Sequence, residues 1–425
     1  EPEVFVASFN RPNLNYRVVP KAKASGQVRQ IVRARPDDSG IVYCQSRRGA
    51  EAMAEALRGD GVPAVPYHAG LEADERQHNQ EAFLRDEVRV VCATIAFGMG
   101  INKPDVRFVI HADLPKSVES YYQETGRAGR DGLPSDCVLL YSRGDVVKYL
   151  RFFEEIADVA ARNEARAQLE KMTHFAEDER CRRVALLGYF GESWTEENCG
   201  ACDQCLSPRE KWDATTDVQK LLSCVLRLRR KSGFATGVAH AAEVLTGGKS
   251  EKILRWGHDT VTTFGIGSDR PRAYWVDLGR QLLRVGLLEA SEDKFATVSV
   301  SARGMDVLRA RERVLLTRPM EAPERAAGSA GRRRVRRAGE IECDEGLFAV
   351  LRKLRSEVAR ARNVPPYVVF SDATLRHMAR EYPRDETALL QIPGVGERKL
   401  ADFGYVFLAA IGGWLHSNPR RTLAA

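Results

Sequence analysis

The sequence predicts a multidomain chain, with a first α/β domain built on a parallel sheet and a mainly helical remainder. Short apolar runs alternate with helical patterns over residues 40–141. Four cysteines then lie within 25 residues, between Cys181 and Cys205. Helices followed by short strands occupy residues 213–313, and a last helical pattern covers residues 347–415. Apolar strands separated by helices indicate a parallel sheet that is covered on both faces.

The strands of this sheet are expected in a regular order along the chain. Ile41 to Cys44 is an apolar run without polar interruption, and a helical pattern follows it until Gly59 and Gly61. Four further runs repeat the strand signal: residues 65–67, 88–93, 106–111 and 137–141. In parallel sheets the functional loops lie at the carboxyl ends of the strands, so functional residues are expected there.

The bulk composition limits the class of protein. The chain has 425 residues, enough for about three domains. Its 44% hydrophobic and 29% charged residues are typical of globular proteins, and its net charge of +7 predicts local basic patches. The sequence lacks an apolar run of about eighteen residues and a signal-peptide pattern, so we expect no membrane association. Because the chain starts at Glu1 without a Met, we expect a further segment before it.

The most informative motif is QETGRAGRDG at residues 123–132. It follows a predicted strand and a predicted helix. Arginine stays protonated, and its planar guanidinium group binds phosphate oxygens in pairs. Arg127 and Arg130, three residues apart among glycines, therefore suit the negative charge that develops in phosphoryl transfer. A solvated basic loop is the alternative interpretation of this run taken alone.

A second candidate segment is TIAFGMGINK at residues 94–103, which follows a predicted strand. Gly98 and Gly100 would let the backbone approach a ligand closely. Thr94 and Asn102 offer hydrogen bonds to phosphate or ribose. Glycine loops after strands are often only turns, so this segment is a weak signal by itself.

Together these segments closely resemble the second motor domain of RecQ-family DNA helicases, in helicase superfamily two. The matching segments are IVYCQSRRGAE, YHAGL, VVCATIAFGMGINKPDVRFVIH and SYYQETGRAGRDG, of which the last is the family's motif VI. By itself YHAGL is explained equally well by a capped helix start with a structural histidine. The resemblance continues through the cysteine cluster and the later domains, so it covers nearly the whole chain.

The resemblance implies roles for individual residues. Arg130 is implied to be the arginine finger, which reaches the γ-phosphate across a cleft between two motor domains. Arg127 is implied to lie at the same interface, and Gln123 to couple the nucleotide to DNA. The expected catalytic residues are Arg130, Arg127 and Gln123, and the expected nucleotide contacts are Gly98, Gly100 and Asn102. The expected DNA contacts of this domain are Ser46, Arg47, His68 and Thr94.

A complete motor of this type also needs a Gly-x-x-x-x-Gly-Lys-Ser/Thr loop for phosphates and an acidic motif for Mg²⁺. The sequence contains neither. Residues 247–250 (GGKS) imitate the end of such a loop, but Glu243 stands where the first glycine belongs and no strand is predicted before it. We therefore expect the first motor domain to be missing and this chain alone not to hydrolyse ATP. ATP and Mg²⁺ are expected cofactors of the intact enzyme.

A metal site is predicted from four cysteines with the spacing C-x17-C-x2-C-x2-C: Cys181, Cys199, Cys202 and Cys205. Four thiolates suit a structural Zn²⁺ ion, and the tight trio also suits an iron–sulphur cluster. The resemblance implies zinc, because RecQ proteins carry a four-cysteine zinc site here. The odd total of nine cysteines argues for metal in a reducing compartment rather than for disulfides. Cys44, Cys92 and Cys137 are expected to be small core residues of strands.

Residues 213–313 have the element order of a winged helix-turn-helix, a module that docks on duplex DNA largely through phosphate contacts. The segment GIGSDRPRAYW at residues 265–275 places two arginines beside aromatic residues. The candidate DNA contacts are Lys249, Arg255, His258, Arg270 and Arg272. The alternative is that these charges are merely solvated and that Tyr274 and Trp275 belong to the core.

The last segment resembles the helicase-and-RNase-D C-terminal (HRDC) domain, through PPYVVFSDATLRHMA and LLQIPGVGERKLADFG. Gly394-Val395-Gly396 is typical of a helix-hairpin-helix turn, whose backbone N–H groups can hold a phosphate. Arg398 and Lys399 are candidate DNA contacts. A helical packing module without a nucleic-acid role is the alternative.

The complete expectation is a RecA-like parallel-sheet domain, a helical zinc-binding subdomain, a winged helix and a small all-α domain. The expected boundaries are 1–145 for the second motor domain, 146–208 for the zinc-binding subdomain, 209–318 for the winged helix, 319–342 for an Arg-rich linker and 343–425 for the HRDC domain. The resemblance implies that the intact protein is an ATP-dependent 3′–5′ DNA helicase of repair, recombination and replication. The alternatives are a non-motor zinc-containing DNA-binding protein and an RNA helicase of the same superfamily.

The same resemblance implies partners and a location. The expected ligand is DNA with junctions between single strands and duplex, and bacterial relatives also bind single-strand DNA-binding protein. We expect a monomer in the bacterial cytoplasm, associated with the nucleoid.

Overall fold

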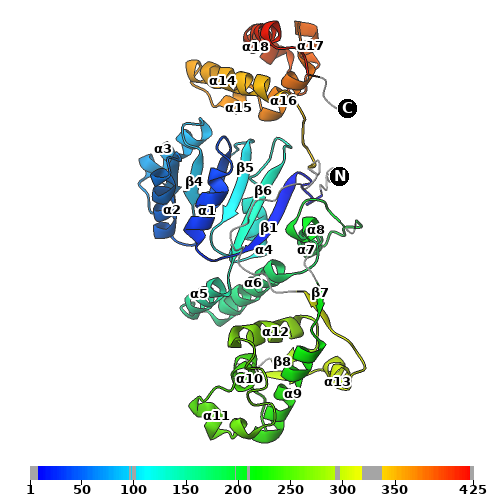
Figure 1. Cartoon of the computed structure of the whole chain (residues 1–425). Coiled ribbons are helices and arrows are strands. Elements are labelled where there is room, and N and C mark those ends of the chain that lie inside the picture. Colours follow the sequence, from blue (N-terminus) through cyan, green and yellow to red (C-terminus); the bar gives the residue numbers. More distant parts are fainter. Residues whose placement is uncertain are drawn as a thin grey trace, which may run out of the picture. The chain divides into compact units, whose positions relative to one another are not determined.

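The structure is a computed structural model, which describes residues 8–94, 97, 102–196, 198–207, 211–291, 297–317 and 337–421. The chain divides into two compact units (Figure 1). The first unit contains Glu1–Pro208 and Glu321–Ala425, and the second contains Arg209–Met320. Each unit encloses buried apolar clusters of its own.

Within the described part of the first unit, six strands form one sheet in which all neighbouring strands are parallel (Figure 1). The strand order is β1-β6-β5-β2-β4-β3. The strands are β1 (Leu14–Pro20), β2 (Ser39–Tyr43), β3 (Ala64–Tyr67), β4 (Val90–Ala93), β5 (Val106–His111) and β6 (Ser135–Tyr141). β2 and β4 are buried along their whole length, as expected for strands covered on both faces. The predicted parallel α/β sheet is confirmed.

Helices cover both faces of this sheet. They are α1 (Ala24–Arg33), α2 (Arg47–Gly59), α3 (Ala73–Leu84) and α4 (Val118–Thr125). On one face, Val42 of β2 and Leu57 of α2 belong to the same buried cluster. On the other face, Tyr121 of α4 packs against Phe175. Because successive side chains of a strand point to opposite faces, Tyr43 points away from the face of Val42 and toward that of α4.

Four helices follow the sheet: α5 (Arg143–Glu154), α6 (Val159–Glu177), α7 (Arg182–Tyr189) and α8 (Asp203–Leu206). Arg182 at the start of α7 is fully buried. Its guanidinium group donates to the carbonyl oxygen of Phe175 at 2.8 Å and to Oδ1 of Asp203 at 2.9 Å. This side chain therefore ties α6, α7 and α8 together around the predicted metal ligands.

β1 is an edge strand that is absent from the predicted strands, because polar Asn15 and Arg17 interrupt its apolar residues. The cysteine-bearing segment covers part of this edge. The N–H group of Tyr16 donates to the carbonyl oxygen of Ala201 at 3.1 Å, and that of Val18 donates to Oδ2 of Asp203 at 3.2 Å. Backbone donors of the edge are thus satisfied by the helical subdomain.

The second unit is mainly helical and, among its described residues, carries two small antiparallel sheets. Its elements are β7 (Lys211–Asp213), α9 (Thr215–Ser232), α10 (Val238–Leu245), α11 (Glu251–Arg255), η1 (His258–Thr260), α12 (Arg272–Arg284), β8 (Leu288–Ala290), β9 (Val298–Val300), α13 (Ala302–Leu308) and β10 (Leu315–Thr317). β8 and β9 form the expected wing. Trp275 is fully buried, and its Nε1 donates to the carbonyl oxygen of Gly267 at 2.8 Å, so this aromatic residue belongs to the core. Residues 247–250 follow helix α10, not a strand.

The C-terminal part of the first unit is helical, with α14 (Glu345–Ala361), α15 (Pro366–Val369), α16 (Asp372–Glu381), α17 (Glu386–Leu390) and α18 (Glu397–Ser417). The buried carboxylate of Asp344 accepts hydrogen bonds from the N–H groups of Gly346 and Leu347 and so caps α14. It also accepts from the hydroxyl of Tyr382 at 3.0 Å and from Nε1 of Trp414 at 3.2 Å. Most of the expected linker, residues 319–342, lies outside the described residues.

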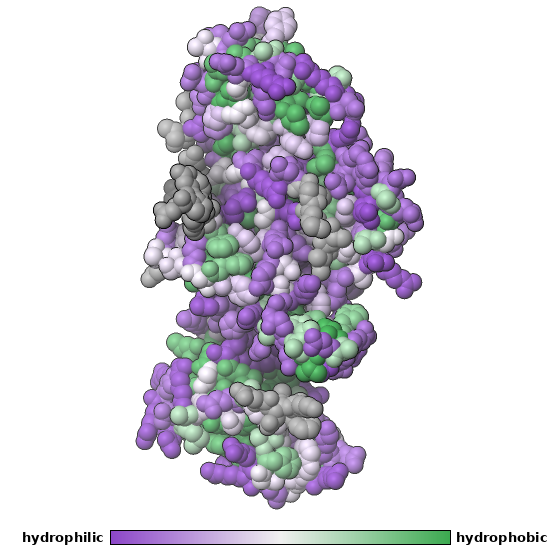
Figure 2. Space-filling model, turned by 180° about the vertical axis from the view of Figure 1, so that it is seen from behind, coloured by the Kyte–Doolittle hydropathy of each residue, from purple (hydrophilic) through white to green (hydrophobic). Residues whose placement is uncertain are grey.

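The surface is predominantly hydrophilic on the side that Figure 2 shows, with apolar residues gathered in small groups. Such a distribution is ordinary for a water-exposed surface. Among the described residues, every helix is too short or too polar to cross a membrane.

Candidate functional site

The arginines of residues 123–132 follow α4 and precede β6, so their loop lies beside the amino ends of β5 and β6. The N–H group of Gly129 donates to the carbonyl oxygen of Val106, the first residue of β5, at 2.9 Å. Arg130 is exposed, and its Nη1 donates to Oδ1 of Asn102 at 2.9 Å. Arg127 is half-buried and Gln123 is exposed. Partial burial lowers the pKa of Arg130, and the neighbouring charges of Arg127 and Arg11 lower it further. The structure thus gathers three guanidinium groups, which remain charged and suit an anionic ligand.

The N-terminal segment braces the backbone of this arginine loop. Nη2 of Arg11 donates to the carbonyl oxygens of Ala128 at 3.1 Å and Gly129 at 2.8 Å. Nδ2 of Asn13 donates to the carbonyl oxygens of Gly129 at 2.8 Å and Leu133 at 2.9 Å. Arg11 and Asn13 are not among the predicted site residues, because each lies more than a hundred residues from its partners and no local motif marks it.

The loop after β4 approaches the arginines at Asn102. Gly98 and Gly100 lie outside the described residues. The N–H group of Thr94 donates to the carbonyl oxygen of Tyr67 at 3.2 Å. Lys103, at the end of the loop, is buried between Asp86 and Asp105 and therefore holds the loop rather than facing a ligand.

The predicted DNA contacts after β2 and β3 fall into two groups. Ser46 and Arg47 are exposed, and Oγ of Ser46 accepts from the N–H group of Gly49 at 3.0 Å as the N-cap of α2. His68 is 2% exposed, its Nε2 lies 3.0 Å from Oε1 of Glu51, and its Nδ1 accepts from the N–H group of Gly70. The expectation that His68 contacts DNA is therefore corrected: its ring organises its own loop and presents no surface.

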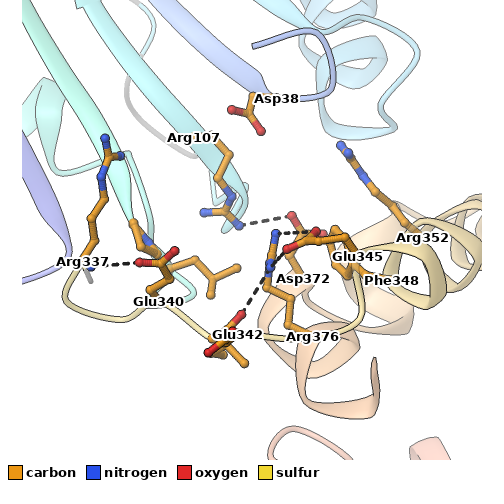
Figure 3. Close-up of a pocket in the computed structure, with 13 residues that line it drawn as sticks. Asp38, Arg107, Arg337, Glu340, Glu342, Glu345, Phe348, Arg352, Asp372 and Arg376 are labelled. Atoms are coloured by element: carbon orange, nitrogen blue, oxygen red, sulfur yellow. Dashed lines mark hydrogen bonds and ion pairs between the residues drawn. The ribbon is translucent and has the colours of Figure 1, made fainter. Parts of the chain in front are cut away.

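Asp131, the residue after Arg130, is fixed from the neighbouring strand. Nη1 of Arg107 on β5 lies 3.0 Å from Oδ1 of Asp131. Arg107 also points toward Asp372 at the start of α16, at 3.3 Å, beside a cavity of about 460 Å³ (Figure 3). Burial by itself raises the pKa of the Asp372 carboxyl group. The neighbouring guanidinium groups of Arg355 and Arg107 outweigh burial and hold this pKa below its usual value. Basic and acidic side chains both line this cavity, so its charge favours no single class of ligand.

The four predicted metal ligands come together. Their Sγ atoms all lie within 4.8 Å of one another, and those of Cys181 and Cys202 are 3.9 Å apart. Tetrahedral zinc with Zn–S bonds of about 2.3 Å places its sulfur atoms about 3.8 Å apart, so the cluster fits that ion. Metal ions bind the deprotonated thiolates, so the affinity of this cluster for zinc depends on pH. Cys44, Cys92 and Cys137 are buried at or within strands of the sheet.

Four of the five candidates in the second unit are exposed: Lys249, Arg255, Arg270 and Arg272. The guanidinium group of Arg270 lies 5.4 Å from the ring centroid of Tyr274. His258 is fully buried, and its Nδ1 lies 2.8 Å from Nε2 of His240. The expectation that His258 contacts DNA is therefore corrected, because its ring is part of the interior.

The C-terminal candidates lie at the start of α18, a helix of 21 residues. Gly394 has a φ of +87°, in the left-handed region that a tight turn requires, and Gly396 is the N-cap of α18. Arg398 is exposed. Lys399 is half-buried, with Nζ 5.4 Å from the ring centroid of Phe370, and burial lowers its pKa. Arg398 is therefore the better placed of the two for a phosphate.

Four family models match consecutive parts of the chain. The Helicase conserved C-terminal domain matches residues 23–132, and the RecQ zinc-binding model matches residues 143–206. The RQC domain matches residues 208–325, and the HRDC domain matches residues 344–411. The order of these models follows the order of the sheet, the cysteine cluster, the winged helix and the final helices.

Curated relatives extend this match over almost the whole chain. The chain is 41% identical over 409 residues to the ATP-dependent DNA helicase RecQ of Haemophilus influenzae, an alignment that covers 96% of this chain and 64% of that protein. It is 36% identical over 403 residues to the ATP-dependent DNA helicase RecQ of Bacillus subtilis, covering 95% and 65%. The chain therefore spans less than two thirds of the length of these relatives. The consecutive models and the continuous similarity show that this chain belongs to the RecQ family, as a C-terminal portion with helicase, zinc-binding, RQC and HRDC domains.

Proposed function

We propose that this chain is the C-terminal portion of an ATP-dependent DNA helicase, which in the intact protein couples ATP hydrolysis to strand separation in the 3′–5′ direction. The observation that carries the proposal is the exposed Arg130, gathered with Arg127 and Arg11 in the loop between α4 and β6 of the parallel sheet. This cluster suits the phosphates of a nucleotide held by a neighbouring domain. The relatives are named ATP-dependent DNA helicases, which supports the same reaction.

The nucleotide-facing residues have distinct proposed roles. Arg130 stabilises the charge that develops on the transferring phosphoryl group, and Arg127 stabilises the same interface. Gln123 couples the nucleotide to bound DNA. Gly98, Gly100 and Asn102 contact the nucleotide. ATP supplies the phosphoryl group, and Mg²⁺ neutralises part of its charge.

The metal proposed for the cysteine cluster is a structural Zn²⁺ ion. Cys181, Cys199, Cys202 and Cys205 can fill all four positions of a closed tetrahedral site, which leaves no open position for catalysis. The match to the RecQ zinc-binding model supports zinc over the iron–sulphur alternative.

The proposed DNA contacts come from three domains. They are Ser46, Arg47 and the half-buried Thr94 in the motor domain, Lys249, Arg255, Arg270 and Arg272 in the winged helix, and Arg398 with the half-buried Lys399 in the HRDC domain. We place the domain boundaries at 1–145, 146–208, 209–318, 319–342 and 343–425. The proposed partners are DNA junctions and single-strand DNA-binding protein. The proposed form is a monomer in the bacterial cytoplasm, at the nucleoid.

The proposal is tested by measuring DNA-stimulated ATP hydrolysis of the full-length protein and of residues 1–425 alone. We expect turnover only from the full-length protein, because residues 1–425 contain no phosphate-cradling glycine loop. In the full-length protein, Arg130→Ala should lower kcat by about 10³-fold or more while DNA affinity is retained. Arg151→Ala, which removes an exposed arginine of α5, is the matched control and should retain kcat. DNA-stimulated turnover by residues 1–425 alone, or a fully active Arg130→Ala enzyme, would contradict the proposal.

A further inference from the structure

The loop after β4 is held from the neighbouring strand by a tyrosine. Tyr43, the last residue of β2, is 4% exposed, and its hydroxyl donates to the carbonyl oxygen of Phe97 at 2.9 Å. The ring of Phe97 is itself held edge-on by Tyr67, at a centroid distance of 4.6 Å. The loop that reaches Asn102 and Arg130 therefore has a fixed point at Phe97.

The same phenol oxygen faces the arginines. Burial raises the pKa of Tyr43, and Glu124 raises it further, so the group stays a neutral phenol. A hydrogen bond with Arg127 opposes this rise. The guanidinium group has only donors, so the phenol oxygen accepts from Arg127 while its hydrogen goes to Phe97. One side chain thus joins Arg127 to the loop after β4.

A second contact fixes the helix that precedes the arginines. His111, the last residue of β5, is paired in register with Tyr43, and the two rings stack at 5.2 Å and 18°. Nε2 of His111 lies 2.7 Å from Oε2 of Glu124 on α4. Both side chains are more than nine-tenths buried. Because a carboxylate accepts only, Nε2 of His111 donates, and the sheet holds α4 close to its last turn.

These contacts form a continuous path from the loop to the arginines. It runs from Phe97 through Tyr43 and His111 to Glu124, one residue after Gln123 and three before Arg127. The two central residues of this path, Tyr43 and His111, are the last residues of β2 and β5, so the sheet holds them in place. A catalytic group needs support of this kind, because small displacements of a transition-state contact cost large factors in rate.

We propose that Tyr43, His111 and Glu124 are positioning residues, which set Arg127 and Arg130 relative to the loop after β4 and so control the rate of hydrolysis without touching the nucleotide. This inference rests on the proposed function. It assigns a task to three buried polar groups that neither bind metal nor face DNA. Its effect should appear in kcat rather than in the affinity for ATP or DNA.

The test is Tyr43→Phe in the full-length protein, which removes the hydroxyl and keeps the stacked ring. We expect kcat of DNA-stimulated ATP hydrolysis to fall about tenfold, with the KM for ATP and the Kd for DNA unchanged within about twofold. Tyr67→Phe is the matched control: it makes the same change at the end of β3, where the hydroxyl donates to Oε1 of Gln80 at 3.3 Å. This control should retain kcat and KM.

Two further variants separate positioning from general stability. Glu124→Gln keeps an oxygen acceptor for His111 and should retain most of the wild-type kcat. Glu124→Leu removes that acceptor and should lose most of the wild-type kcat. If Tyr43 acts through the arginine, Tyr43→Phe should cause no further loss in an Arg127→Ala protein. Additive losses, or a Tyr43→Phe protein with wild-type kcat, would overturn the inference. A wild-type protein without DNA-stimulated turnover would instead overturn the proposed function, so the two failures are distinct.

Discussion

Gly129 determines the course of the backbone between the two arginines of motif VI. Its φ of +56° lies in the left-handed region, which glycine adopts at little cost. A Cβ atom here would lie 2.5 Å from Nδ2 of Asn13 and 2.8 Å from the carbonyl oxygen of Leu133. The position of Arg130 therefore depends on a residue without a side chain, packed against the N-terminal segment.

Gly129→Ala should destabilise the protein more than Gly132→Ala does. Both glycines have positive φ, which costs alanine about 1–2 kcal/mol, but a Cβ at Gly132 meets no atom within 4 Å. Overpacking adds about 1–3 kcal/mol at Gly129 alone. We expect urea denaturation followed by circular dichroism to show a loss of about 3 kcal/mol for Gly129→Ala and about 1 kcal/mol for Gly132→Ala. Equal losses would show that the contacts with Asn13 and Leu133 do not resist the added atom.

At the scale of single residues, sequence motifs identified the candidate ligand-binding side chains but not the residues that hold them in position. The arginines and the four cysteines carry their signal in local spacing, and the structure brings each set together. His68 and His258 are also predicted as DNA contacts from their local sequence, yet both rings are buried. Burial depends on elements that are distant in the sequence. Arg11 and Tyr43 have no motif at all, because their importance comes from partners far along the chain.

At the scale of elements, the zinc-binding subdomain and β1 depend on each other. β1 is an edge strand, and the segment from Ala201 to Asp203 supplies hydrogen-bond acceptors for its outer N–H groups. Arg183 adds a donor to the carbonyl oxygen of Leu14 at 3.1 Å. Five strands could be predicted as apolar runs, among them the other edge strand, β3. β1 could not, because polar Asn15 and Arg17 interrupt its apolar residues.

Removal of the metal should therefore loosen both the subdomain and the edge of the sheet. Metal binding contributes directly to folding at such sites. We expect chelation to lower the melting temperature by at least about 5 °C and to speed proteolysis between Arg180 and Leu206. Metal analysis should find one zinc per chain in the wild type and in Cys343→Ala, and none in Cys202→Ala. A chelated protein that melts like the untreated one, or iron in place of zinc, would contradict this prediction.

The pair of His240 and His258 should make the second unit sensitive to acid. Burial lowers the pKa of both rings. His258 lowers the pKa of His240 further, against a smaller opposing effect of Glu243, and Asp259 only partly offsets the effect of burial on His258. A folded-state pKa below the unfolded value of about 6.5 means that the unfolded state binds more protons. The stability from these rings is thus complete above about pH 6.5 and is lost as the pH falls toward the folded pKa values.

This acid sensitivity can be measured by thermal unfolding, followed through tryptophan fluorescence, because Trp256 packs against both rings. The melting temperature should fall between about pH 7.5 and about pH 5.5. His240→Gln should reduce that fall, because it removes one titrating ring and keeps an amide donor toward His258. His416→Gln, which removes an exposed histidine, is the control and should leave the fall unchanged. An unchanged pH dependence in His240→Gln would contradict the assignment.

At the scale of the whole molecule, basic side chains are distributed over both units rather than concentrated in one. The net charge of +7 is small for 425 residues, so the proposed affinity for DNA has to come from local groups. Exposed arginines occur in the winged helix, at the start of α18 and in the motor domain, where Arg47 follows β2 at the start of α2. Such groups act on phosphates and add affinity without sequence preference.

The contribution of the winged helix should appear in the salt dependence of DNA binding. The side chains of Arg270 and Arg272 are 53% and 55% exposed, so both can reach phosphates. The slope of log Kobs against log salt is negative, and losing one arginine–phosphate contact makes it less steep by about 1. The double variant with Arg270→Ala and Arg272→Ala should therefore have a slope that is less steep by about 2. Arg280→Ala on α12 is the control, because its side chain is only 34% exposed and its Nη1 lies 3.0 Å from Oδ1 of Asp277. The nearest carboxylates of Arg270 and Arg272 are both 3.9 Å away. Fluorescence anisotropy of a tailed duplex, from about 50 mM to about 300 mM salt, measures these slopes. An unchanged slope in the double variant, or an equal drop in Arg280→Ala, would show that this surface does not touch the DNA backbone, since only a released counterion changes the slope.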